Sequence, residues 1–207
     1  MNIVHLNRTQ KAESFFPIVA ISSASSEIEI LKKIISEFPA DSRMAYLIME
    51  DLYFPQTENL ALELESYSEM PVIEIVSSVD LHPNHIYVIP ANNFLEIENG
   101  SLVLKSRTRS SNSANCLDFF FDSLASIYKS YTIGLVISGS AVDGFAGLKK
   151  VKEMGGTSIA ILHKKGVPKN DDTGNFIDYF SPQDRVSDKL KEIQNSYVVN
   201  HAYQDHQ

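Results

Sequence analysis

Short apolar runs alternate with amphipathic stretches along most of the chain. The apolar runs are typical of strands buried on both faces of a sheet, and the amphipathic stretches place their apolar residues on one face of a helix. The runs that predict central strands are residues 16–21, 44–49, 71–76, 132–138 and 158–162. Helices are predicted at residues 27–38, 59–68, 118–128 and 145–154, with a short closing helix at 187–194. This alternation predicts an α/β fold: a doubly wound, mostly parallel sheet flanked by helices.

One segment in the middle of the chain departs from this alternation. Residues 85–90, 94–98 and 101–105 have the pattern of an antiparallel meander, and Asn99-Gly100 separates the last two runs. Asn-Gly favours a type I′ turn, because both central residues of that turn need a positive φ. The sequence therefore predicts an antiparallel β-hairpin inserted mid-chain.

Composition restricts the class of protein. The 207 residues, 43% of them hydrophobic, fit a single domain over residues 1–207 with a core at about 17–195 and polar tails. A formal net charge of −8 argues against nucleic-acid binding, which usually requires a basic surface. The single cysteine excludes an internal disulfide, and neither a membrane-spanning run nor a signal-peptide pattern is found. We therefore expect a cytoplasmic protein without membrane insertion, and the oligomeric state is left open.

The stretch 132–154 carries the first candidate for chemistry. A buried strand is followed by a loop of small residues, 139–144, and then by a helix that ends at Gly155-Gly156. In open parallel sheets, ligands and reacting groups gather where strands end and helices begin. Asp143 lies in this loop, so its carboxylate is predicted to be either a working group or a cap for the helix start.

Two stretches resemble the C-terminal catalytic domain of the CheB-type protein-glutamate methylesterases, and the resemblance spans about residues 17–162. Residues 81–90, LHPNHIYVIP, and the hairpin after them are similar to the family's Leu-x-Pro-Gly-His-x-Tyr run. Residues 134–148 are similar to its Gly-x-Gly-x-Asp-Gly-x-x-Gly run, which puts Asp143 at the position of the catalytic aspartate. The resemblance implies removal of methyl esters from glutamates on chemoreceptor helices. Only about 16 residues precede the first strand, so the family's usual receiver domain is expected to be absent.

The same resemblance implies that the catalytic triad is incomplete. Ester hydrolysis of this kind needs a serine nucleophile, a histidine base and an aspartate that orients the histidine. An ungapped match of residues 20–27 puts Ala24 at the serine position, and residues 48–52 put Asp51 at the histidine position. The family's Gly-Gly after the nucleophile is Ser26-Glu27 here, and its Arg-His-Arg-Pro-Ser-x-Asp run keeps only Asp118. The charged side chain of Glu27 is expected to narrow the cleft.

Other residues could in principle supply the missing chemistry. Ser25 becomes the nucleophile if the match shifts by one residue, but a solvated carboxylate such as Asp51 is a poor base for a serine hydroxyl. His163 is interpreted as a solvated loop residue, His82 as a surface residue and His85 as part of the scaffold. Asp51 and Asp143 alone are weak evidence for a metal site, so we predict no metal and no cofactor.

Two hypotheses follow from these residues. The first is a catalytically inactive CheB-like domain that acts as a scaffold. It would bind a chemoreceptor-like helix or another signalling protein in the cleft that corresponds to the family's active site. The second is a hydrolase of carboxylic esters with a rearranged site that uses Ser25. A serine oxygen within hydrogen-bond reach of a histidine at the carboxyl edge of the sheet would favour the second hypothesis.

Overall fold

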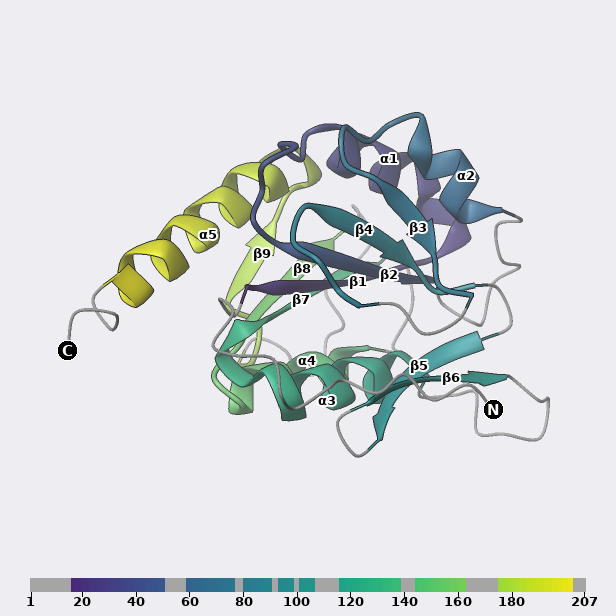
Figure 1. Cartoon of the computed structure of the whole chain (residues 1–207). Helices are drawn as coiled ribbons and strands as arrows, with labels where there is room; N and C mark the ends of the chain where they lie inside the picture. Colours follow the sequence, from purple (N-terminus) through teal and green to yellow (C-terminus); the bar gives the residue numbers. More distant parts are fainter. Residues whose placement is uncertain are drawn as a thin grey trace.

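Seven parallel strands form the central sheet of the computed structural model (Figure 1). The structure describes residues 16–50, 59–76, 80–90, 93–98, 101–106, 116–138, 144–162 and 175–202. The strand order is β3-β4-β2-β1-β7-β8-β9. The strands are β1 Ile18–Ser23, β2 Ala45–Glu50, β3 Val72–Glu74, β4 His85–Val88, β7 Thr132–Ser138, β8 Thr157–Leu162 and β9 Tyr179–Ser181.

Helices cover both faces of this sheet (Figure 1). Helices α1 (Ile28–Ser36), α2 (Leu60–Glu65) and α5 (Val186–Ala202) lie on one face, and α3 (Cys116–Tyr128) and α4 (Phe145–Glu153) on the other. Short 3₁₀ turns precede α1 and α5 and follow α3, at Ser25–Glu27, Gln183–Arg185 and Lys129–Tyr131. The doubly wound α/β architecture predicted from the sequence is confirmed.

Burial of the central strands explains why apolar runs in the sequence predicted them. Every residue of β1 and β2 is buried, because helices pack on both sides of them. The apolar face predicted for the first helix is also present, since Leu31, Ile34 and Ile35 are fully buried in α1. Each such side chain contributes about 1.5–3 kcal/mol relative to an exposed position. These contacts fix the position of the β1–α1 junction.

Close helix packing also depends on glycine at one position of α4. A Cβ added to Gly147 would lie 2.7 Å from the Phe121 Cβ and 2.9 Å from the Asp118 Cα of α3. Those separations are shorter than real carbon contacts allow, so α3 and α4 can approach this closely only with glycine there.

The predicted meander is wrong in its first strand. Strand β4 does not pair with the hairpin; it lies between β3 and β2 in the parallel sheet. Its residues Ile86, Tyr87 and Val88 are buried because the sheet covers both of its edges and helices or loops cover its faces. The remaining two strands, β5 (Asn93–Glu98) and β6 (Ser101–Ser106), pair antiparallel with Glu98 opposite Ser101, which confirms the inserted hairpin.

The C-terminal region was also predicted incompletely. Strand β9 was not predicted, and α5 continues well beyond the predicted 187–194. Among the α5 side chains that the structure describes, the buried apolar ones are Val186, Leu190 and Ile193. Within the described residues, no helix has both the length and the apolar character that crossing a membrane requires.

Candidate functional site

Three strands end side by side at the carboxyl edge of the sheet. The sheet grows outward from β1 in two directions, with β2 on one side of it and β7 on the other. This edge therefore contains the topological switch point at which open α/β sheets bind their ligands. Ser23, the last residue of β1, pairs with Glu50 of β2 and with Ile137 of β7. Ala24 therefore follows β1 at this edge, while Asp51 is the next residue in sequence after Glu50.

Ala24 makes the strand-to-helix turn at the position predicted for a nucleophile. Its backbone is extended, with φ −84° and ψ 152°, and its methyl group is only 5% exposed. Its carbonyl oxygen accepts hydrogen bonds from the Glu27 amide at 2.8 Å and from the Ser23 hydroxyl at 3.2 Å. The turn is thus held by its backbone, and the residue at its start carries no group that can attack an ester.

Ser25 is the first residue of the 3₁₀ turn and is partly exposed. In such a turn each residue advances about 120° around the axis, so its hydroxyl leaves the backbone in another direction than the Ala24 side chain. Whether Ser25 reacts stays a prediction.

The imidazoles whose side chains the structure describes, His82 and His85, lie at the other end of the sheet. His85 begins β4 and aligns with Ala45, the first residue of β2. Glu50 ends β2 five residues later, about 16 Å further along at about 3.3 Å per residue. Within the described side chains, Ser25 therefore has no histidine within hydrogen-bond reach. His163 lies outside the described residues.

Two acidic side chains are buried at the candidate site. Glu27, the last residue of the 3₁₀ turn after Ala24, is 7% exposed, and Glu50 at the end of β2 is 5% exposed. Both have interaction partners. Because Glu27 stands where the family match has glycine, a buried carboxylate side chain takes up room beside the strand end. Whether Glu27 narrows a cleft at this edge stays a prediction.

Asp118 of α3 binds the start of α4. Its Oδ1 accepts hydrogen bonds from the amides of Gly144 at 3.1 Å and Gly147 at 2.7 Å. Burial raises the pKa of the Asp118 carboxyl, and these amide hydrogen bonds oppose the rise. Gly144, with φ 96°, provides the left-handed turn into the helix. A carboxylate from another helix thus caps the helix start, a role that the sequence had left open for Asp143.

The remaining predicted site residues, Asp51 and Asp143, lie outside the described residues. Their predicted roles, including a shared metal site, are therefore not tested. Among the residues that the structure describes, no group of three or more histidine, cysteine, aspartate or glutamate side chains is placed to hold a metal ion.

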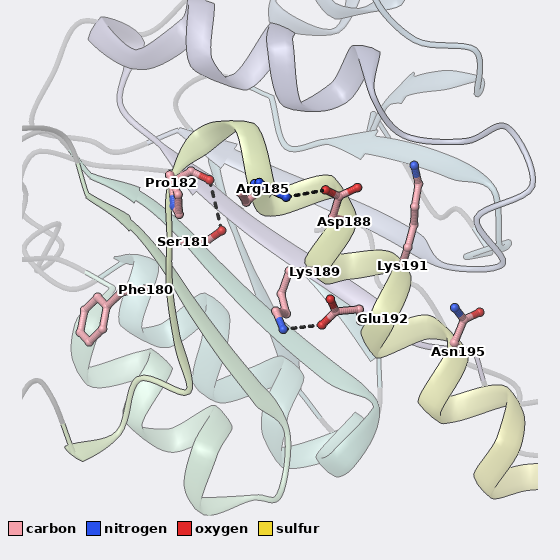
Figure 2. A pocket seen from close by; sticks show the side chains of 9 residues that line it. All are labelled: Phe180, Ser181, Pro182, Arg185, Asp188, Lys189, Lys191, Glu192 and Asn195. Carbon is pink, nitrogen blue, oxygen red and sulfur yellow. Dashed lines mark hydrogen bonds and ion pairs between the residues drawn. The ribbon is translucent and has the colours of Figure 1, made fainter.

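A groove that the sequence did not predict lies between β9 and α5 (Figure 2). It has a volume of about 540 Å³ and is lined by residues that include Phe180, Arg185 and Lys191. Two ion pairs lie on this side: Arg185 of the preceding 3₁₀ turn pairs with Asp188 of α5 at 3.7 Å, and Lys189 pairs with Glu192 within α5 (Figure 2). β9 is separated from β1 by β7 and β8, so the groove is distinct from the candidate site at Ala24.

The fold and the strand-end site define a class of protein: a doubly wound α/β domain whose functional groups are expected at the β1–β7 switch point. A family model described as CheB methylesterase matches residues 19–168, and the chain belongs to this family.

Solved and curated proteins agree with this assignment. The crystal structure of the Thermotoga maritima CheB methylesterase catalytic domain superposes with a TM-score of 0.72 and 30% identity, covering 87% of this chain and 100% of that one. The protein-glutamate methylesterase/protein-glutamine glutaminase of Thermotoga maritima is 30% identical over 184 residues, covering 85% of this chain and 54% of that protein. The protein of the same name in Methanosarcina barkeri is 25% identical over 201 residues, covering 91% of this chain and 55% of that protein. The chain thus spans about half the length of these curated relatives.

Proposed function

We propose that this chain is a catalytically inactive CheB methylesterase domain that serves chemotaxis signalling as a binding or scaffold module. The observation that carries the proposal is the methyl group of Ala24 at the end of β1, where the family match requires the nucleophile. The module is taken to be a single domain over residues 1–207 and to work in the cytoplasm.

The chemistry of ester hydrolysis explains why this substitution matters. The acyl carbon of the ester must be attacked by an oxygen nucleophile whose proton a nearby base accepts. Removing the nucleophile or the base of such a triad costs on the order of 10⁶ in rate, as measured for subtilisin. A solvated carboxylate such as Asp51 would be a poor replacement for an imidazole, because it is a weak base for a serine hydroxyl.

The intact framework supports a role in binding. The described strands β1, β2 and β7 still end together, and α4 is still capped and packed through Asp118 and Gly147. A chain that kept this edge of the sheet without its chemistry retains a preformed surface for a partner. We propose a chemoreceptor-like helix or another signalling protein as that partner, bound at the carboxyl edge.

The test measures methyl release from methylated chemoreceptors in membranes. Wild type and Ser25→Ala are both expected to release no more methanol than buffer. A third variant, Ala24→Ser with Glu27→Gly and Asp51→His, restores the family residue types at these three positions and is expected to gain measurable release. Co-sedimentation of the wild type with the same membranes tests binding directly.

Serine-dependent turnover would overturn the proposal. If wild type releases methyl groups and Ser25→Ala does not, the rearranged hydrolase is correct, consistent with the partial exposure of Ser25. If wild type neither hydrolyses nor co-sediments with receptor membranes, the binding role on chemoreceptors is wrong.

A further inference from the structure

Two imidazoles lie next to each other at the amino edge of the sheet, remote from the candidate site. His82 and His85 flank the turn that leads into β4, and their ring centres are 5.9 Å apart with the ring planes tilted by 51°. His82 is exposed and His85 is partly exposed, so both rings can be reached from solvent. The proposed function makes no use of either residue.

The tautomer of His85 is fixed by its surroundings. Its Nδ1 lies 2.9 Å from the carbonyl oxygen of Pro83, which can only accept a hydrogen bond. Nδ1 therefore carries the proton, and Nε2 keeps the lone pair. Metal-binding histidines commonly have this arrangement, in which one ring nitrogen donates to a carbonyl and the other binds the ion.

The loop that carries both rings is held at several points. The fully buried hydroxyl of Tyr87 accepts a hydrogen bond from the His82 amide at 2.9 Å and donates to the Asp80 carbonyl at 3.1 Å. The Asn84 amide donates to the Met44 carbonyl at 2.7 Å. These bonds fix the backbone on both sides of the turn, so little conformational freedom would be lost when the two rings bind one ion.

The separation of the rings suits a shared ion. Two imidazoles on one ion with metal–nitrogen bonds of about 2.0–2.1 Å have their ring centres about 5–6 Å apart. We infer that His82 and His85 form a two-imidazole site for a divalent transition-metal ion such as Zn²⁺, Ni²⁺ or Cu²⁺. With two protein ligands, the ion keeps positions open for water or for a further donor.

The experiment is a calorimetric titration of the untagged full chain, freed of metal by a chelator, with NiCl₂ and with ZnCl₂. Wild type is expected to bind, and His82→Ala and His85→Ala are each expected to weaken that binding by at least about tenfold, the lower end of the loss caused even by removing an outer partner of a metal ligand. His201→Ala, in the last turn of α5, is the matched control and is expected to bind like wild type.

Of the two variants, His82→Ala is the more informative, because the side chain is exposed and its removal leaves the fold intact. In metal-free wild type, substoichiometric Cu²⁺ is expected to broaden the imidazole NMR signals of His82 and His85 before those of the other histidines. Unchanged affinity in His82→Ala, broadening that begins at another histidine, or no binding by wild type at millimolar ion would each overturn the inference.

Discussion

The capping of α4 by Asp118 gives the sharpest prediction of stability. Asp118→Ala leaves the amides of Gly144 and Gly147 without their acceptor. An unsatisfied buried donor costs about 1–3 kcal/mol, and loss of a helix cap typically costs about 1 kcal/mol. Relief from burying a carboxylate offsets part of this cost, because burial is what raises the pKa of Asp118. We therefore expect a net loss of about 2 kcal/mol, or roughly 4–8 °C in Tm for a chain of this size.

Urea unfolding followed by far-UV circular dichroism measures this loss directly. Asp122→Ala is the matched control, since Asp122 lies one helical turn further along α3 and is partly exposed. Asp118→Asn is expected to lose less, because an amide oxygen can accept the same hydrogen bonds. If Asp118→Ala unfolds at the same urea concentration as Asp122→Ala, Asp118 does not cap α4 in solution.

The pH dependence of the same variants has a definite sign. A carboxyl group whose pKa is raised by folding contributes stability below its unfolded pKa of about 4, and this contribution is lost as the pH rises through the folded pKa. Relative to Asp118→Asn, wild type should therefore lose stability as the pH rises from below about 4 through the raised pKa of Asp118. If wild type instead gains stability relative to Asp118→Asn as the pH rises, the hydrogen bonds to Asp118 outweigh the effect of burial on its pKa.

Two further predictions concern packing and acid stability. Leu31→Ala in α1, at a fully buried position, should lower the free energy of unfolding by about 2–5 kcal/mol. Leu62→Ala in α2, whose side chain is 69% exposed, is the control and should change it by less than about 0.5 kcal/mol in the same urea unfolding experiment. For Asp178, burial would raise the pKa, but the Lys152 ammonium and the amide and hydroxyl of Ser158 outweigh it and lower the pKa. The stabilisation from the Asp178 carboxylate is therefore present above its unfolded pKa of about 4 and is lost as the pH falls through the folded pKa. The difference in unfolding free energy between wild type and Asp178→Asn should accordingly shrink on acidification. A difference that stays constant with pH would contradict this.

The sequence predicted the parts of the fold that depend on local pattern. β1 and β2 were recognisable because a strand covered on both faces needs apolar side chains in both directions, and residues 18–23 and 45–50 largely supply them. The hairpin was recognisable because the dipeptide Asn-Gly between two alternating runs favours a hairpin, and β5 and β6 do pair antiparallel. The partner of a strand is not encoded locally, so β4 was assigned to the hairpin rather than to the sheet.

The parts of the site that depend on distant contacts could not be predicted. Asp118 and Gly147 are 29 residues apart, and only the packing of α3 on α4 brings the carboxylate to the amide. The sequence did single out Asp118, because it is the one residue that agrees with the family's Arg-His-Arg-Pro-Ser-x-Asp run. Nothing in the sequence specified that this residue caps α4. His82 was interpreted as an isolated surface residue because its distance from the His85 ring is set by the turn at Asn84, whose φ is 62°.

The contact between α3 and α4 has a consequence for assigning activity from motifs. Part of the Asp-Gly-x-x-Gly run that suggests an esterase is required for folding: Gly144 turns the backbone into α4, and Gly147 lets the two helices meet. A descendant that abandons hydrolysis still needs both glycines to remain folded. Such a run therefore reports ancestry and architecture, and whether an ester can be cut depends on the nucleophile and the base at the strand ends.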